Sequence, residues 1–219
     1  FVEQGGVWSI SGGLHALAVA LAQAAIAKGA RLHLDTQVDA IDVSGGSAHG
    51  VRTSDGRGFC AEAVIFNGDR AALRTGLLGG DARDATVGTG VERSLSAVTW
   101  LMGGRARGFP LTRHNVFFSS NYPREFADIA SGRLPTDPTV YVCAQDRDAA
   151  GAAPENDRLL ILVNAPARGD GSFPSTKETA ACETTTFDRL AAAGLEVTEA
   201  TRICVTPRDF ETLFPATGG

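Results

Sequence analysis

The spacing of hydrophobic positions changes near the start of the chain. Between Gly12 and Gly29, apolar residues recur every three or four positions, which predicts a helix that Ser11 caps and Gly29 ends. The pattern then becomes that of short strands, first over residues 31–35 and again over residues 38–43. A helix that leads directly into a strand is one unit of an α/β fold.

The glycine pair at the start of this helix is the first candidate for binding chemistry. Gly12 and Gly13 have no side chains, so a ligand or another backbone can come close to the positive N-terminal end of the helix. A turn with a purely structural role explains the pair as well, and the spacing alone favours that reading.

A second polar site follows a predicted strand. Residues 59–66 predict a strand whose second half is continuously apolar, as in a strand covered on both faces. Asn67 and Asp69 come next, just before a helix predicted over residues 70–77. Ligands of α/β proteins bind at such strand ends. A turn followed by a helix N-cap accounts for the same two residues equally well.

The second half of the chain predicts a mostly antiparallel sheet with helices packed on one face, so that the whole is a mixed α/β protein. A loop rich in Gly, Asp and Thr over residues 79–90 predicts the boundary between the halves. Runs typical of strands occupy residues 95–102, 116–119, 139–144, 159–164 and 202–205. Helices are predicted over residues 122–129, 175–193 and 207–214, the second with a Ser175–Glu178 capping box.

Composition excludes several functions. The 219 residues carry 20 Lys and Arg against 25 Asp and Glu, and this net charge of −5 argues against a general nucleic-acid-binding surface. The four cysteines are far apart and form no CxxC pair, so neither a zinc site nor a disulfide framework is indicated. The first residue is not Met and the last two are Gly, from which we expect a fragment of a longer protein.

Residue types alone name few candidates for chemistry. His114 precedes a strand and is a candidate for lining a cavity, with a surface histidine as the alternative. Trp100 and Phe117 are candidates for the wall of an apolar pocket, with core packing as the alternative. Residues 146–148, Asp-Arg-Asp, suit a catalytic acid tuned by an arginine, although a solvated loop explains them better.

Several stretches match one family in order along the chain. They are Val7-Trp8 with Gly12-Gly13-Leu14, residues 63–69, residues 114–119, residues 137–139 and residues 206–210. Each stretch is weak alone, but the ordered set resembles the bacterial phytoene desaturase family of FAD-dependent carotenoid desaturases. Residues 142–147 and 186–195 are most like the branch that desaturates 1-hydroxy- and 1-methoxycarotenoids.

The resemblance implies the domain organisation. The chain would be the central part of a two-domain flavoprotein of the amine-oxidase or glutathione-reductase type. Residues 1–79 would belong to the FAD-binding domain, without its GxGxxG segment, and residues 80–205 would form an antiparallel substrate domain. Residues 206–219 would return towards the FAD-binding domain. We therefore expect the isolated 219 residues to bind FAD weakly and to be inactive.

The resemblance also implies the chemistry. Gly12, Gly13, Val38 and Asn67 would lie near FAD, whereas no catalytic residue can be carried over. The implied reaction is a 3,4-desaturation of an acyclic carotenoid, with FAD as the acceptor. The intact enzyme would be cytoplasmic and would contact the inner membrane peripherally. Phytoene desaturase, a carotenoid isomerase or oxygenase, and a non-enzymatic domain that binds apolar ligands are the alternatives.

Overall fold

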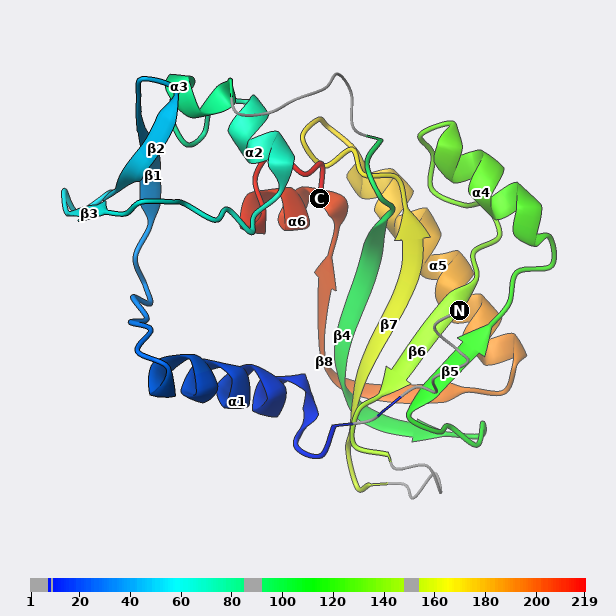
Figure 1. Ribbon diagram of the computed structural model, residues 1–219. Coiled ribbons are helices and arrows are strands. Elements are labelled where there is room, and N and C mark those ends of the chain that lie inside the picture. The colour runs from blue at the N-terminus through cyan, green and yellow to red at the C-terminus, as the bar shows by residue number, and fades with distance from the viewer. Residues whose placement is uncertain (1–7, 9, 85–91, 148–153) are drawn as a thin grey trace. The chain divides into compact units, whose positions relative to one another are not determined.

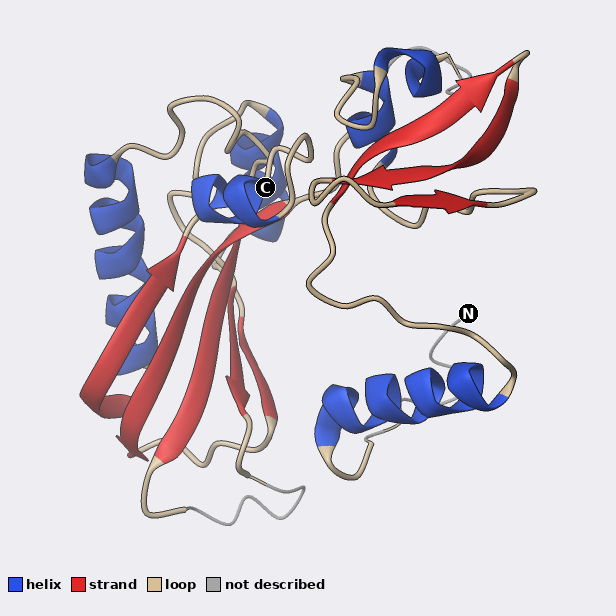
Figure 2. Cartoon of the chain, turned by 90° about the vertical axis from the view of Figure 1, so that its left-hand side faces the viewer, coloured by secondary structure: helices blue, strands red, loops and turns tan. Residues whose placement is uncertain are grey.

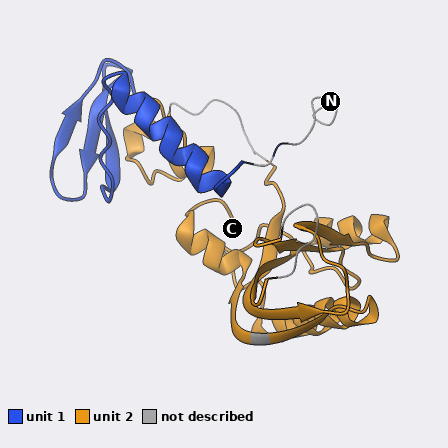
Figure 3. Cartoon of the chain, turned by 90° about the horizontal axis from the view of Figure 1, so that it is seen from below, with its two compact units in different colours: residues 1–64 blue, residues 65–219 orange. Residues whose placement is uncertain are grey.

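The chain folds into two compact units. The structure is a computed structural model that describes residues 8, 10–84, 92–147 and 154–219 (Figure 1). Unit 1 comprises residues 1–64 and unit 2 residues 65–219 (Figure 3). The domain limits expected at residues 79–80 and 205–206 remain a prediction, since a compact unit need not coincide with a domain of the intact protein.

Unit 1 contains one helix and a three-stranded antiparallel meander. Helix α1 is Gly13–Ala27, and the strands are β1 (Val38–Ser44), β2 (Ser47–Thr53) and β3 (Gly58–Cys60). The expectation that Ser11 caps α1 is wrong, because Gly12 holds the N-cap position with a φ of 84°. Gly29 follows the helix with a φ of 93°, which confirms the predicted helix end.

One predicted strand and the second half of another are absent from the structure. Residues 31–35, and residues 63–66 of the strand predicted over residues 59–66, have no regular secondary structure and belong to neither sheet of the described residues. Their apolar side chains are uncovered: Leu34 is 79% exposed and Ile65 94% exposed. An extended segment becomes a strand only when a neighbour accepts and donates its backbone hydrogen bonds. These two predictions were wrong because an apolar pattern does not show whether a neighbouring strand is present to form the backbone hydrogen bonds.

Unit 2 is built on a five-stranded sheet in the order β5-β6-β7-β4-β8, antiparallel at every pairing (Figures 1 and 2). The strands are β4 (Ser96–Arg107), β5 (His114–Phe117), β6 (Val140–Ala144), β7 (Asp157–Ala165) and β8 (Glu196–Val205). The helices are α2 (Arg70–Arg74), α3 (Gly80–Arg83), α4 (Tyr122–Ala130), α5 (Thr176–Ala192) and α6 (Pro207–Leu213). The predicted antiparallel sheet is confirmed, with β4 and β8 longer than expected, while α3 occupies part of the predicted loop over residues 79–90.

Helix α5 covers one face of this sheet, as predicted (Figure 2). Its Ser175–Glu178 capping box is present. Trp100 of β4 is fully buried beneath it, where the indole N–H donates to Glu183 at 3.0 Å and the ring meets Phe187 edge-on. The valines and isoleucine of β6 and β7 that face the same way are also fully buried. The core of unit 2 therefore lies between the sheet and α5.

Candidate functional site

The other face of the unit 2 sheet carries apolar side chains that no helix of the core covers. Cross-strand pairing defines two rows on this face, because directly opposed residues point the same way. The first row is Ile203, Leu101, Leu160, Cys143 and His114, and the second is Val205, Thr99, Leu162, Tyr141 and Val116. We call these ten residues the open face. Ile203 is 62% exposed and Leu101 41%, whereas Thr99 is 5% exposed, so the exposed part of the face is mainly apolar and is interrupted at Thr99.

A polar cluster lies at the β5–β6 end of the open face. The Tyr141 hydroxyl is 2.7 Å from Nδ1 of His114, and the two rings are stacked with an angle of 17° between their planes. Burial, followed by the hydrogen bond with the Cys143 thiol, raises the pKa of Tyr141 to about 12. The phenol is therefore neutral at physiological pH and keeps its O–H proton available for hydrogen bonding.

A cavity of about 940 Å³ opens beside the open face, still within unit 2. It lies among α2, the start of β4, the end of β7 and the segment after α6; its lining includes Asp69, Arg74, Arg93, Leu162, Asn164 and Gly219. Leu162 belongs both to this lining and to the open face, and it is the direct cross-strand partner of Tyr141. Leu162 of the cavity lining and Tyr141 of the polar cluster thus lie on neighbouring strands, β7 and β6.

An ion pair fixes the polar wall of this cavity. The Arg93 guanidinium donates to both carboxylate oxygens of Asp170, at 3.0 and 2.7 Å, and to the carbonyl of Ala167 at 3.0 Å. These hydrogen bonds raise the pKa of Arg93 and lower the pKa of Asp170. Gly218 packs directly on them, since a Cβ there would lie 2.5 Å from the Ala167 oxygen. The wall therefore requires glycine where the chain passes over Arg93.

Sequence reasoning missed a buried carboxylate at the end of the sheet. Glu125 of α4 is 1% exposed and accepts from the backbone N–H of Thr139 at 3.0 Å and from the Asn164 amide at 3.4 Å. Asn164 also lines the cavity, so Glu125 positions one of its polar groups. The pattern of α4 places Glu125 near Phe126 and Ile129 but cannot reveal these partners, which lie 14 and 39 residues away.

The structure separates the three residues expected at a substrate site. His114 lies on the open face, whereas Phe117 and Trp100 point into the core beneath α5, where they are 8% and 0% exposed. Phe117 packs against Phe109, with ring centroids 4.9 Å apart. The role of these residues towards a substrate stays a prediction, and the geometry favours His114. Tyr141 was missed, although the alternation of valine with Tyr and Cys in β6 places it on the face of His114.

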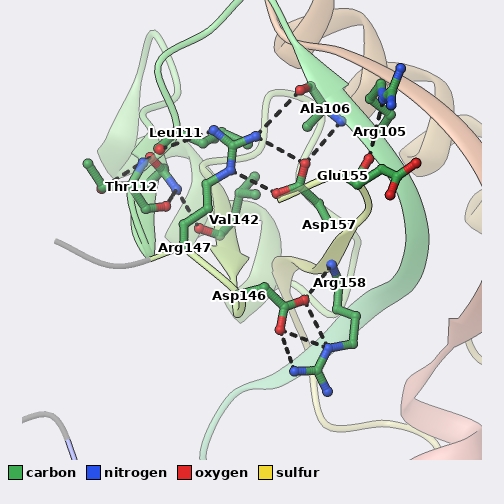
Figure 4. Close-up of polar contacts among 11 residues, drawn as sticks. Arg105, Ala106, Leu111, Thr112, Val142, Asp146, Arg147, Glu155, Asp157 and Arg158 are labelled. Atoms are coloured by element: carbon green, nitrogen blue, oxygen red, sulfur yellow. Dashed lines mark hydrogen bonds and ion pairs between the residues drawn. The ribbon is translucent and has the colours of Figure 1, made fainter. Parts of the chain in front are cut away.

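In the Asp-Arg-Asp stretch the reading as a solvated loop is wrong for Arg147, which is buried, whereas Asp146 is exposed and a catalytic role for the stretch stays a hypothesis. Arg147 is 4% exposed and binds Asp157, itself 1% exposed, through Nε at 2.8 Å and a terminal nitrogen at 3.0 Å (Figure 4). Asp146 instead pairs with Arg158 nearer the surface. Asp148 lies outside the described residues. Arg147 serves to join β4, β7 and the loop before β5, which the reading as a solvated loop did not foresee.

The four residues expected near FAD lie on two units. Gly12 and Gly13 begin α1, Val38 begins β1, and Asn67 lies in the extended segment before α2. The N-terminus of α1 has no side-chain cap and no acidic residue in its first turn; the Gly13 N–H donates to the Ile10 carbonyl at 2.9 Å, which leaves the N–H groups that follow it for an anionic group. This end of the helix fits the requirements of a phosphate or of a flavin ring edge, both of which accept hydrogen bonds. The roles of the four residues stay predictions.

Two further findings concern metal ions and membranes. Within the part of the chain that the structure describes, no three His, Cys, Asp or Glu side chains come together in a way that could hold a metal ion. None of the described helices combines the length and the apolar character needed to cross a membrane.

Comparison with known proteins identifies the class. Residues 1–85 match the family described as flavin containing amine oxidoreductase. A solved structure of an oxidoreductase from Methanosarcina mazei aligns with 89% of the chain and 42% of its own length, with a TM-score of 0.52 and 17% identity, which shows a shared fold. The expected mixed α/β flavoprotein fold is thereby confirmed, and the class is that of flavin-dependent oxidoreductases.

The curated relatives narrow the class to a family. The chain is 48% identical to hydroxyneurosporene desaturase of Rubrivivax gelatinosus over all of its length, and 41% identical to that of Cereibacter sphaeroides over 99%. It is 36% identical to the zeta-carotene-forming phytoene desaturase of Myxococcus xanthus over 76% of its length. The chain belongs to this family of flavin-dependent carotenoid desaturases, as the resemblance predicted. It spans about 42–44% of the length of the hydroxyneurosporene desaturases.

Proposed function

We propose that this chain is the central part of an FAD-dependent desaturase that removes hydrogen from an acyclic 1-hydroxy- or 1-methoxycarotenoid. The observation that carries the proposal is the open face, an uncovered apolar sheet surface in a chain 48% identical to a hydroxyneurosporene desaturase. An acyclic carotenoid is a long hydrocarbon, and its transfer from water to such a surface is favourable by about 25 cal/mol per Å² of apolar area buried.

FAD supplies the hydride acceptor for this chemistry when it is bound. All four residues expected near it fall within the stretch that matches the flavin family, residues 1–85. In this proposal Gly12 and Gly13 let the cofactor approach the N–H groups at the start of α1. Their φ angles of 84° and 78° are ones that glycine adopts without strain, so a larger residue there would disturb the helix start as well as fill the space.

In unit 2, this chain's own residues bind and orient the substrate. The leucines of β4 and β7 on the open face contact the polyene and exclude water from it. The 940 Å³ cavity beside Leu162 has the size of a small-molecule site, which suits one section of an extended carotenoid. No side chain of the described residues is assigned the transfer of the proton, because none that lines the cavity is placed against a reacting atom.

A related reading keeps the family and changes the substrate. The relatives include a zeta-carotene-forming phytoene desaturase and a 4,4'-diaponeurosporene oxygenase, at 36% and 29% identity. The higher identity to the hydroxyneurosporene desaturases favours a hydroxylated substrate. We also propose that the whole enzyme works in the cytoplasm at the surface of the inner membrane, because its hydrocarbon substrate partitions into lipid.

The test uses the full-length protein that contains this chain. The purified protein is incubated in liposomes with 1-hydroxyneurosporene, with neurosporene and with phytoene, and the products are separated. Conversion of the hydroxylated carotenoid to a longer polyene, in preference to the other two, is the expected result. Preferred conversion of phytoene would move the proposal to a phytoene desaturase. Binding without conversion of any carotenoid would leave only a domain that binds apolar ligands.

A further inference from the structure

We propose that His114 and Tyr141 form the subsite that recognises the terminal hydroxyl group of the substrate and thereby set the preference for a hydroxylated carotenoid. This inference rests on the proposed function, because it concerns which end of a carotenoid meets the open face. It assigns to this residue pair the choice between a hydroxylated carotenoid and one without a hydroxyl group.

The position of the pair supports this role. His114 and Tyr141 belong to the two rows of the open face, next to Cys143 and Val116 on β5 and β6. Towards β7 and β4 the first row continues as Leu160 and Leu101, and the second as Leu162 and Thr99. The surface is therefore mostly apolar, with Thr99 buried within it, and carries a hydrogen-bonding pair at one end. A hydroxylated polyene has the same arrangement, a long hydrocarbon that ends in one neutral polar group.

The hydrogen-bonding capacity of the pair matches a hydroxyl group. The 2.7 Å contact joins Nδ1 of His114 to the Tyr141 oxygen, and within the described residues no group hydrogen-bonds His114 Nε2. If the tyrosine donates, Nε2 carries a proton and the phenol oxygen still accepts. If Nδ1 donates, Nε2 accepts, and the substrate oxygen competes with the Cys143 sulfur for the phenol proton. Either tautomer therefore presents one donor and one acceptor, which is what an alcohol pairs with.

The pair also lies at a suitable distance from the cavity. Tyr141 is directly opposite Leu162, which lines the cavity, and neighbouring strands are about 4.8 Å apart. A substrate whose hydroxyl group binds the pair would place its adjoining carbons over Leu162. A carotenoid without the hydroxyl would cover the same polar atoms with hydrocarbon and leave their remaining hydrogen bonds unmade, which is unfavourable.

The test is Tyr141→Phe in the full-length flavin-loaded protein, which removes the hydroxyl and keeps the ring. The measurements are the KM for 1-hydroxyneurosporene and the inhibition constant of neurosporene as its competitor. One neutral hydrogen bond corresponds to about 3- to 10-fold in affinity. We expect the KM to rise by about that factor, whereas the inhibition constant of neurosporene should fall or stay the same, because the variant removes a polar atom that this hydrocarbon leaves without a hydrogen bond. His114→Phe should act in the same direction, and its exposed position lowers the risk of misfolding.

Tyr122→Phe is the matched control. Tyr122 is the other tyrosine of the chain, lies on α4 and packs edge-on against Phe118 and Phe126, neither of which belongs to the two rows. It should leave both constants unchanged. Equal changes for the two carotenoids in Tyr141→Phe, or no change in either variant, would overturn this inference alone. A wild-type protein that neither converts nor binds any carotenoid would instead overturn the proposed function, and this inference with it.

Discussion

Removal of the Arg147 side chain should destabilise unit 2 far more than removal of the neighbouring Arg158. Arg147 and Asp157 are both buried, and Asp157 also accepts the backbone N–H of Ala106 at 3.1 Å (Figure 4). Arg147 in turn donates to the carbonyls of Leu111 and Ala106, each at 3.4 Å. Arg147→Met leaves a buried carboxylate without its counter-charge and two carbonyls without this donor.

The expected loss follows from the burial of the pair. Breaking a buried ion pair by removing one partner costs about 3–5 kcal/mol in the free energy of unfolding. The pair Asp146–Arg158 provides the comparison, because it involves the adjacent residues but the Arg158 side chain is 72% exposed. Arg158→Met should cost about 0–1 kcal/mol. The double variant Arg147→Met with Asp157→Leu should recover part of the loss, because it removes both charges together.

Urea unfolding followed by tryptophan fluorescence measures these differences. The chain has two tryptophans, of which Trp100 is fully buried in unit 2 and Trp8 is 85% exposed, so the fluorescence change reports mainly on unit 2. Equal losses for Arg147→Met and Arg158→Met would refute the reasoning. A double variant less stable than Arg147→Met would also refute the reasoning. The loss would then come from altered packing of the side chains and not from the unpaired charge of Asp157.

Three further predictions concern single groups. Cys60 is exposed and should react with a thiol reagent in the native state. Cys182 is buried, its pKa is raised to about 12 mainly by desolvation, and it should react only when the protein unfolds. Mass spectrometry of the labelled protein, native and unfolded, counts the thiols that have reacted. Gly108→Ala should lower the free energy of unfolding by about 1–3 kcal/mol more than Gly56→Ala. Both glycines have a positive φ, but only at Gly108 would a Cβ lie 2.1 Å from a carbonyl oxygen. Urea unfolding of the two variants measures the difference. The pKa of Tyr141 is raised to about 12, so the native state keeps a proton that the unfolded state releases near pH 10. The free energy of unfolding should therefore fall as the pH rises from about 10 to about 12. In an alkaline absorbance titration the native protein should show a late tyrosine step that is absent from Tyr141→Phe.

Local patterns were sufficient to predict much of unit 2. The capping box of α5 and the proline at the start of α6 are signals within a few residues, and both helices begin where these signals place them. Runs of apolar residues likewise located β6 and β7. The predicted end of β4 and the predicted start of β8 were wrong. β4 continues through Gly103-Gly104 and β8 begins at residue 196; the two extensions pair with each other although neither has an apolar pattern.

The site was harder to predict because its parts come together only through pairing between strands. The contact of His114 with Tyr141 spans 27 residues, and that of Trp100 with Glu183 spans 83. No local pattern distinguishes the open face from the face beneath α5, so Trp100 and His114 were expected together although they lie on opposite faces. The same limit applies to Arg147, whose buried partner lies beyond a long charged loop.

The measurement that tests the central claim most directly is a single turnover of the full-length flavoprotein without oxygen. The oxidised protein is mixed with 1-hydroxyneurosporene in liposomes, and the flavin and polyene absorbances are followed together. The account predicts that the oxidised flavin band is lost as the polyene absorbance shifts to longer wavelength, with equal amounts of flavin reduced and double bond formed. A purified protein without flavin, or flavin that stays oxidised while the carotenoid is unchanged, would contradict it.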